Sequence, residues 1–316
     1  MAGGQVRVAV VGAGEIGRGW AALCAAHGWP VTVYDNDARA LEDARREIAN
    51  RAQALLALAH ADAALVDQGV KYLAAGRSLL DACKDAEWVI EAVHEDLIQK
   101  QRLFKAIESS AQKARIITSS SSTLAPGDIA AQCRFQQRIL IAHPLNPPEL
   151  IPLVELLPSS QTDRALVEVL KGWLRALGRI PVTLKKPVRG HVANRIAAAV
   201  WREAIDLVLK GAIDVDDLDR AVSLGPGLGW AAAGPHLTYH LAAGTRGVSG
   251  FLQHLLQSFE TMWSELASWE KLEREQEHKL VHAIERAYEE NIERIRGARD
   301  RRLAAILQAL ETSKST

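Results

Sequence analysis

Two side chains near the middle of the chain have the chemistry of a proton-transfer pair. His143 follows the apolar run 139–142, and Glu155 lies in the apolar run Leu153-Val154-Glu155-Leu156-Leu157. A histidine with a pKa near neutrality can exchange a proton with a hydroxyl. A carboxylate in so apolar a strand is costly unless it is paired, and it could fix the tautomer of His143. The alternatives are a histidine that caps a strand end and a glutamate on an exposed strand face.

Two further polar residues suit hydrogen bonds to a substrate oxygen, and both have structural alternatives. Ser122 ends a run of four serines after the strand-like Ile116-Ile117, and such hydroxyls can instead cap a following helix. No Gly-x-Ser-x-Gly elbow surrounds Ser122, which argues against a nucleophile. Asn194 opens a helical region, either as its N-terminal cap or as an amide donor directed at the sheet. The pattern leaves both readings of Asn194 open.

A glycine fingerprint near the start of the chain predicts a dinucleotide site. The apolar run 8–11 precedes Gly12-Ala13-Gly14-Glu15-Ile16-Gly17, and a second apolar run, 31–34, leads to Asp35. Gly12 permits a sharp turn, Gly14 leaves room for a pyrophosphate, and Gly17 lets the helix approach the strand. The pyrophosphate would rest on the N–H groups at the start of that helix.

The acid that ends the second strand bears on the choice of cofactor. Asp35 can accept hydrogen bonds from a ribose diol but repels a 2′-phosphate, and Asn36 and Asp37 bring no cation. The expected cofactor is therefore NAD, and NADP is disfavoured.

Strands and helices alternate through the first part of the chain. Apolar, strand-like runs begin near residues 8, 31, 88, 116, 139, 153 and 181, and helices are predicted at about 39–59, 97–109 and 163–177, with another starting at Pro126. This order predicts an α/β fold, a Rossmann-type doubly wound, mostly parallel sheet. His143 would lie at the carboxyl edge of the sheet, where ligands bind.

Strand signals vanish after about Val192, which predicts a smaller all-helical domain. We expect an NAD-binding domain at 1–188 and a helical domain for substrate binding and dimerisation at 189–316, with a loop between Gly225 and Gly247. The tail repeats apolar residues amid charges, at Leu266, Trp269, Leu272, Leu280, Ile284, Tyr288, Ile292 and Ile295. Such helices either pack on their own domain or form a subunit interface, and we favour a homodimer.

Composition excludes several classes of partner. Lys plus Arg and Asp plus Glu are 38 each in 316 residues, so no whole-chain charge favours nucleic acid or an anionic membrane. Cys24, Cys83 and Cys133 lie far apart and indicate core thiols in a reducing compartment. The chain enters a strand almost at once and contains no run of 18 apolar residues, which predicts a soluble cytoplasmic protein.

A cluster of acids could suggest a metal site. Asp214, Asp216, Asp217 and Asp219 lack the glycine and distal glutamate of a calcium loop. Acids at a helix start stabilise its dipole, so we expect capping of a helix near Leu218 and no metal.

Taken in order, these motifs resemble those of the L-3-hydroxyacyl-CoA dehydrogenase superfamily over residues 6 to about 250. The resemblance rests on the fingerprint with Asp35, the segment 91–97 with Lys100, Ser122, the segment His143-Pro-Leu-Asn-Pro, Pro-Leu-Val-Glu155-Leu and Asn194-Arg195. Within the superfamily, the serine run and the segment 151–156 look closer to the lambda-crystallin branch, which includes L-gulonate 3-dehydrogenase, and to carnitine dehydrogenases.

The resemblance implies a role for each matching position. His143 would remove the hydroxyl proton and Glu155 would orient it, while Ser122 and Asn194 would hydrogen-bond the reacting oxygen. In the cofactor site, the backbone of Glu15 and Ile16 would meet the pyrophosphate and Asp35 the adenosine ribose. Glu95 and Lys100 would line the cofactor and substrate cleft, and Asn146 would lie near the nicotinamide.

The chain departs from the lambda-crystallin branch at Gly229, where members of that branch tend to carry an arginine. If that arginine grips a substrate carboxylate, this chain lacks the grip, and His236, His240 or Arg246 would have to compensate. We expect an enzyme that transfers hydride between NAD and the C3 hydroxyl of a small L-3-hydroxy acid, or the matching 3-keto acid. The alternatives are a short-chain L-3-hydroxyacyl-CoA dehydrogenase and a non-catalytic NAD(H)-binding protein.

Overall fold

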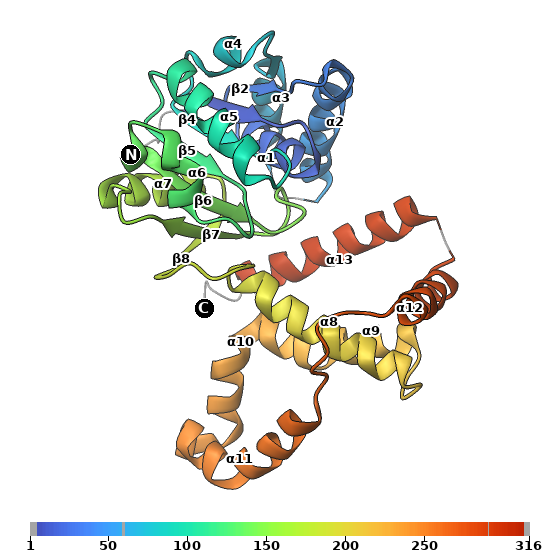
Figure 1. Ribbon diagram of the computed structural model, residues 1–316. Helices are drawn as coiled ribbons and strands as arrows, with labels where there is room; N and C mark the ends of the chain where they lie inside the picture. Colours follow the sequence, from blue (N-terminus) through green and yellow to red (C-terminus); the bar gives the residue numbers. More distant parts are fainter. Residues whose placement is uncertain (1–4, 59–60, 290, 313–316) are drawn as a thin grey trace. The chain divides into compact units, whose positions relative to one another are not determined.

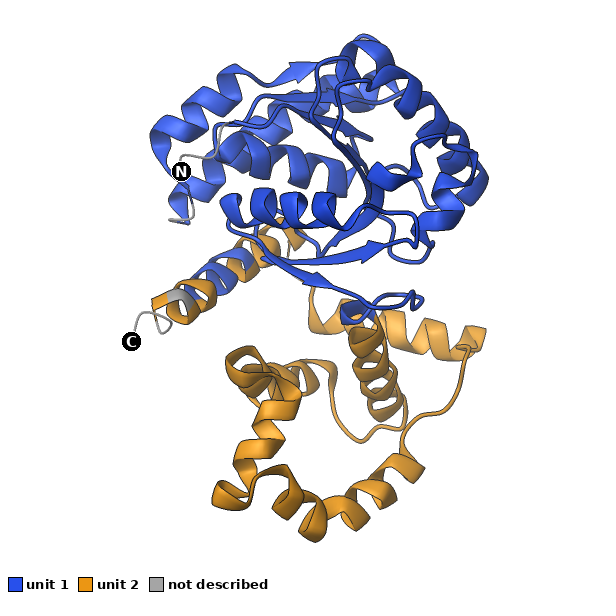
Figure 2. Ribbon diagram, turned by 90° about the vertical axis from the view of Figure 1, so that its left-hand side faces the viewer, with its two compact units in different colours: residues 1–194, 300–305 blue, residues 195–299, 306–316 orange. Residues whose placement is uncertain are grey.

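The computed structural model describes residues 5–58, 61–289 and 291–312 (Figure 1). It divides into two compact units, residues 1–194 with 300–305 and residues 195–299 with 306–316 (Figure 2). The first residues of the chain and the predicted helix end at Ala59 lie outside the described residues.

The first unit contains an eight-stranded sheet in the described part of the chain, with the order β3-β2-β1-β4-β5-β6-β7-β8. The strands are β1 Val8–Val11, β2 Val31–Tyr34, β3 Ala74–Ala75, β4 Trp88–Glu91, β5 Ile116–Ser119, β6 Ile139–Pro144, β7 Leu153–Pro158 and β8 Ile180–Thr183. Neighbouring strands pair in parallel except β6 and β7, which are antiparallel. The predicted doubly wound, mostly parallel sheet is confirmed.

Helices cover both faces of this sheet (Figure 1). They are α1 Glu15–Ala26, α2 Ala38–Ala57, α3 Ala63–Lys71, α4 Leu79–Cys83, α5 Leu97–Ser110, α6 Pro126–Ile129 and α7 Arg164–Ala176. Successive residues of β1 point to opposite faces. Val10 packs in one core with α1, α2 and α7, and Val11 packs in another with α4 and α5. The sequence analysis missed α3, β3 and α4, which are short.

The glycine fingerprint has the backbone that its sequence predicts. Gly12 adopts a φ of +109°, and a Cβ there would lie 2.5 Å from the carbonyl oxygen of Ala92. A Cβ on Gly17 would lie 1.9 Å from the carbonyl oxygen of Gly12, so only glycine lets α1 pack this closely on the turn. A Cβ on Gly14 would meet no atom within 4 Å. The open side of Gly14 is where a ligand can approach the backbone.

The second unit contains helices and connecting segments, with no strand among its described residues. Its elements are α8 Ala193–Leu209, which begins in the first unit, α9 Val215–Leu224, α10 Pro226–Ala242, α11 Gly247–Glu265, α12 Arg274–Ala287 and α13 Ile292–Thr312, whose residues 300–305 belong to the first unit. The predicted loop between Gly225 and Gly247 is wrong, because α10 fills most of it. Its glycines and Pro235 read as helix breakers, but Pro226 begins the helix and Gly234 only kinks it.

Several apolar residues of the predicted tail pattern make contacts within the second unit. Leu280 and Ile284 on α12, with Tyr288 after it, line a small cavity of about 140 Å³ together with residues of α8 and α9, and Leu280 is buried. Trp269 donates a hydrogen bond from Nε1 to Asp206 Oδ1 at 3.2 Å. These residues therefore make contacts within their own unit, and their part in a subunit interface stays a prediction. Among the described helices, none is long and apolar enough to cross a membrane.

Candidate active site

The carboxyl ends of β1, β2 and β4 surround a cleft of about 420 Å³. Gly12, Gly14 and Asp35, all predicted cofactor residues, line it, and Tyr34, His94 and Gln99 add side chains that the sequence analysis did not single out. The other predicted cofactor residues, Glu15, Ile16, Gly17, Glu95, Lys100 and Asn146, are not part of its lining.

The start of α1 suits a pyrophosphate. Gly14 is the N-cap residue of this helix and supplies no side-chain cap, so the first N–H groups can serve an anion. Asp35 Oδ2 accepts from the Ala13 N–H at 2.7 Å, and Asp35 Oδ1 accepts from the Asp37 N–H at 2.9 Å. The carboxylate is thus fixed beside the glycine turn and lines the cleft, where a ribose diol could donate to it. These features fit a dinucleotide.

His143 and Glu155 face each other across the antiparallel strands. They are register partners in β6 and β7, and His143 Nδ1 lies 3.1 Å from Glu155 Oε2. Both side chains are buried, and the second carboxylate oxygen, Oε1, accepts from the backbone N–H groups of Val192 at 2.9 Å and Ala193 at 3.1 Å. Because a carboxylate accepts, Nδ1 carries the proton in this pair. Nε2 then keeps a lone pair that can accept a proton from a ligand.

Burial sets the direction in which the pKa of His143 moves. Loss of solvent lowers the pKa below its usual value, and the hydrogen bond with Glu155 partly opposes this while the neighbouring His191 reinforces it. The imidazole is therefore neutral at neutral pH, which is the state that a general base requires.

His191 is a contact of His143 that the sequence analysis missed. The two rings are 5.0 Å apart between centroids. His191 is buried, and its Nε2 donates to the carbonyl oxygen of Ser121 at 3.1 Å, because a carbonyl only accepts. The adjacent Gly190 N–H donates to the carbonyl oxygen of Ser122 at 3.0 Å. Residues 190–193 thus hold both the serine loop and Glu155. A histidine after a glycine carries no sequence signal of this role.

Ser122 and Asn194 lie on segments that meet this pair. Ser122 is half-buried, and within the described residues its hydroxyl makes no hydrogen bond, so capping does not occupy it. Asn194 is the second residue of α8 and so lies inside the helix. The proposed N-cap role of Asn194 is therefore wrong, because Glu155 accepts from the residues at which the helix begins. An amide donor remains the other reading.

A fully buried ion pair lies behind the site, at the carboxyl edge of β4 and β5. Lys100 Nζ lies 2.6 Å from Glu91 Oε1 and 3.1 Å from the carbonyl oxygen of Val93, and both side chains are at most 1 % exposed. Ser119 Oγ donates to Glu91 Oε2 at 2.5 Å. The expectation that Lys100 lines the cleft does not fit this burial, since its ammonium faces other protein groups. Its principal partner is Glu91, a contact that the sequence does not indicate.

Glu95 connects this ion pair to the serine loop. Its Oε1 accepts from Ser121 Oγ at 2.5 Å, from the Thr123 N–H at 3.1 Å and from Thr123 Oγ1 at 2.7 Å, and its Oε2 lies 3.5 Å from Lys100 Nζ. Burial raises the pKa of Glu95, but these hydrogen bonds and the charge of Lys100 outweigh it and lower the pKa below its usual value. The carboxylate is one-third exposed, so it can also face a ligand.

The remaining predicted positions are Asn146 and several residues of the second unit. Asn146 is exposed on the loop between β6 and β7. In the second unit, Gly229 faces open space, Arg246 Nη1 contacts His254 Nε2 at 2.6 Å, and His240 Nδ1 accepts from the Val248 N–H at 3.2 Å.

The acids predicted to cap a helix of the second unit contact other protein groups, and Asp219 accepts a hydrogen bond from the Tyr288 hydroxyl. Asp214 is the N-cap residue of α9 without a side-chain cap bond, and Asp216 and Asp217 pair with Arg220. Over the described residues, no group of three or more His, Cys, Asp or Glu side chains is placed to hold a metal ion.

Comparisons with known proteins match most of the chain. Residues 7–187 match the family model described as 3-hydroxyacyl-CoA dehydrogenase, NAD binding domain, and residues 190–282 match the model described as 3-hydroxyacyl-CoA dehydrogenase, C-terminal domain. L-carnitine dehydrogenase of Nocardiopsis dassonvillei is 33 % identical over 96 % of this chain and 91 % of its own length.

Solved structures are also similar to this chain over most of its length. The crystal structure of 5-formyl-3-hydroxy-2-methylpyridine 4-carboxylic acid 5-dehydrogenase, an NAD⁺-dependent dismutase, has a TM-score of 0.80 at 28 % identity and covers 97 % of this chain and 99 % of that one. The (S)-3-hydroxybutyryl-CoA dehydrogenase of Ralstonia eutropha has a TM-score of 0.62 at 25 % identity, covering 82 % of this chain and 88 % of that one.

The buried ion pair makes a prediction about stability. Lys100→Met leaves Glu91 as an uncompensated buried carboxylate, and we expect this to lower the free energy of unfolding by about 3–5 kcal/mol. The double variant Glu91→Gln/Lys100→Met should recover most of the loss in urea denaturation followed by tryptophan fluorescence. Lys113→Met, which breaks the exposed pair with Asp85, is the control and should leave the urea midpoint almost unchanged. A Lys100→Met variant as stable as the parent but weak in NADH binding would show instead that Lys100 serves the cofactor.

Proposed function

Because the chain belongs to the 3-hydroxyacyl-CoA dehydrogenase family and uses NAD, we propose that it oxidises the C3 hydroxyl of a small L-3-hydroxy acid of the carnitine type, with His143 as general base. It is an NAD-dependent dehydrogenase acting on a CH–OH group. The observation that carries the proposed residue roles is the buried contact of 3.1 Å between His143 Nδ1 and Glu155 Oε2.

The pair can move one proton at a defined atom. With Nδ1–H donated to Glu155, the lone pair of His143 Nε2 accepts the substrate hydroxyl proton as the carbonyl forms. A bound nicotinamide would supply the hydride acceptor for the same carbon. His143 is then an imidazolium, which the Glu155 carboxylate stabilises. In the reducing direction, His143 Nε2 returns the proton to the oxygen.

Two donors would hold the reacting oxygen while this proton moves. The free hydroxyl of Ser122 and the amide of Asn194 are proposed for this role, since one lies on the loop that residues 190–191 hold and the other follows the backbone donors to Glu155. Their hydrogen bonds strengthen as negative charge develops on the oxygen.

Some cofactor residues would bind through their backbone N–H groups and others through their side chains. We propose that the N–H groups of Glu15 and Ile16 meet the pyrophosphate and that Asp35 binds the adenosine ribose. The place of Glu15 and Ile16 at the start of α1 and the lining of the cleft by Asp35 support these roles. By family resemblance, Glu95 is assigned to the cofactor and substrate cleft and Asn146 to the surroundings of the nicotinamide. Lys100 contributes by holding Glu91 and Glu95.

Two findings bear on the substrate. Relatives of similar length, at about one-third identity over nearly the whole chain, are named L-carnitine dehydrogenase, which supports a small hydroxy acid without a CoA tail. This chain has Gly229 where members of the lambda-crystallin branch tend to have an arginine that could bind a substrate carboxylate. The contacts at the far end of the substrate therefore differ from those in that branch. The likeness to a 3-hydroxybutyryl-CoA dehydrogenase keeps a short-chain acyl-CoA as the second candidate.

A substrate panel tests this proposal. L-carnitine, L-gulonate, 3-hydroxybutyrate and 3-hydroxybutyryl-CoA are compared by NADH absorbance, and we expect the highest kcat/KM with a free acid.

His143→Gln should lose about 10²–10⁴-fold in kcat while NADH still binds. The rate of the parent enzyme should fall only below about pH 6.5, because burial lowers the pKa of His143.

Other outcomes of the panel favour the rivals. A clear preference for the CoA thioester would identify an acyl-CoA dehydrogenase. Tight NADH binding with no turnover of any hydroxy acid would favour a non-catalytic, crystallin-like protein, and full activity of His143→Gln would remove that residue from the mechanism.

We also propose that the chain forms a homodimer, through α10 and α11 rather than through the tail. α10 carries no Asp, Glu, Lys or Arg in 17 residues, and it buries none of its residues within the chain. Its Leu241 is 62 % exposed, and on α11 Leu252, Leu255 and Met262 recur at helical spacing with exposures above 40 %. A second copy of the chain would cover these apolar stripes in a self-complementary interface.

Light scattering tests the dimer. The parent protein should have the mass of two chains, and Leu241→Asp should shift it towards one chain, because a charge in an apolar interface loses its hydration. Leu80→Asp is the matched control, since Leu80 in α4 is 59 % exposed and should leave the mass unchanged. A monomeric parent, or a Leu241→Asp variant that keeps the mass of two chains, contradicts this interface.

Cysteine usage supports a cytoplasmic location, which we propose as well. Cys24, Cys83 and Cys133 are free and buried, and burial raises the pKa of Cys83 to about 12 and that of Cys133 to about 11. Such thiols are inert core residues suited to a reducing compartment.

A further inference from the structure

Glu15 brings a negative charge to the helix start at which the cofactor's anion is expected. It is the first residue of α1, directly after Gly14, and its side chain is half exposed. An acid there stabilises an empty helix N-terminus. A pyrophosphate at the same N-terminus brings two negative charges, which repel that acid. Something must therefore neutralise Glu15 for the anion to bind well.

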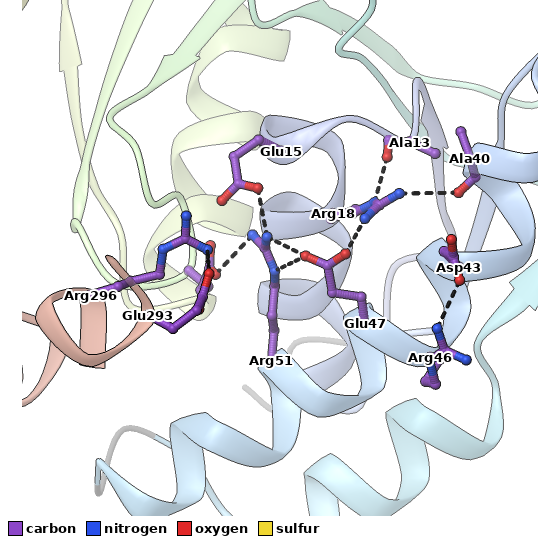
Figure 3. A network of polar contacts seen from close by, with 11 residues as sticks. Ala13, Glu15, Arg18, Ala40, Asp43, Arg46, Glu47, Arg51, Glu293 and Arg296 are labelled. Atoms are coloured by element: carbon purple, nitrogen blue, oxygen red, sulfur yellow. Dashed lines mark hydrogen bonds and ion pairs between the residues drawn. The ribbon is translucent and has the colours of Figure 1, made fainter. Parts of the chain in front are cut away.

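Arg51, on α2, supplies the opposite charge. Its Nη2 lies 2.7 Å from Glu15 Oε2 and 2.5 Å from Glu47 Oε1, and its Nη1 lies 3.3 Å from Glu149 Oε1. Figure 3 shows the guanidinium between Glu15 and Glu47, with both carboxylates directed at it. The side chain is only 14 % exposed, so solvent screens these contacts weakly. Burial lowers the pKa of Arg51, but its carboxylate partners outweigh this and raise it.

A second arginine holds the glycine turn itself. Arg18 Nε donates to the carbonyl oxygen of Ala13 at 2.6 Å, and its Nη2 donates to the carbonyl oxygen of Ala40 at 3.2 Å. Its Nη1 pairs with Glu47 (Figure 3). Burial raises the pKa of Glu47, but Arg51 and Arg18 together outweigh this effect and lower the pKa below its usual value. Glu47 thus joins the two arginines, and Arg51 is fixed relative to the turn.

The third carboxylate that contacts Arg51 is Glu149, on the segment that follows β6. Glu149 lies on the loop between β6 and β7, is 8 % exposed, and has an Oε2 atom that finds no partner among the described residues. Burial raises its pKa. A Cβ on Gly19 of α1 would lie 2.5 Å from this oxygen, so the glutamate packs directly on the cofactor helix. Arg51 therefore contacts α1 and the loop after His143 at once.

We propose that Arg51 is a positioning residue for the dinucleotide, which holds the Glu15 carboxylate towards α2 and cancels its charge so that the pyrophosphate can bind at the start of α1. The inference rests on the NAD site and not on the substrate proposed above, so failure of the substrate panel leaves it intact. A purely structural Arg51 would instead act through packing, whatever residue stands at position 15.

NADH titrations followed by fluorescence distinguish the two roles. Arg51→Gln should weaken NADH binding about tenfold, because it frees a carboxylate beside the anion site. Removing that carboxylate as well, in Glu15→Gln/Arg51→Gln, should restore the dissociation constant to within about twofold of the parent value. The weakening in Arg51→Gln should also shrink as KCl is raised, since added salt screens the repulsion.

Control variants keep the test decisive. Arg46→Gln, on the same helix, removes an exposed arginine that pairs with Asp43 and should leave the dissociation constant unchanged. If Arg51→Gln does not fold, Glu15→Gln alone still tests the inference, because it should bind NADH as tightly as the parent or more tightly. Equal weakness of the single and double variants, unchanged binding in Arg51→Gln, or weaker binding in Glu15→Gln would each overturn the proposal.

Discussion

The carboxylate of Glu155 is shared between an imidazole and two backbone amides, and the arrangement of the site depends on that sharing. One oxygen meets His143 and the other meets the N–H groups of Val192 and Ala193. The side chain is buried, so each donor it loses would leave a costly unpaired group. The same carboxylate thus orients the proposed base and anchors residues 190–193, which hold the serine loop.

The sheet makes this contact possible through its one antiparallel pairing in the described residues. In a parallel sheet, residues at the carboxyl ends of neighbouring strands lie side by side, as Glu91 and Ser119 do in β4 and β5. The reversal of β7 instead brings Glu155, near the middle of its strand, opposite His143 near the end of β6. Polar groups that would be costly in an apolar core are gathered at one edge, where each finds a partner.

Local sequence patterns were sufficient for the sheet and for the contact between His143 and Glu155. Gly12, Gly14 and Gly17 specify their turn through backbone conformation and close approach, which residue type alone reveals. The pairing of His143 with Glu155 followed from the cost of an acid in an apolar strand. The misreading of α10 has the opposite cause, since glycine and proline usually break a helix and here only begin and kink it.

Contacts between distant segments could not be predicted in this way. Lys100 lies on a helix face among polar residues, and only the fold shows that its ammonium reaches Glu91 in β4. Arg51 and His191 likewise have ordinary sequence surroundings, and each has partners on two segments distant in the sequence. The apolar tail pattern was real, but its periodicity cannot say whether the covering surface is a neighbouring helix or another chain.

The role of Glu155 is tested most directly by single-turnover hydride transfer in Glu155→Gln, with NADH affinity measured beside it. A glutamine can still accept from Val192 and Ala193, but its amide would donate to His143 and shift the ring proton to Nε2, where the base must accept. The hydride-transfer rate should fall by about 10²–10⁴-fold with NADH binding nearly unchanged. A rate within about threefold of the parent enzyme would contradict the role of Glu155 in orienting the base.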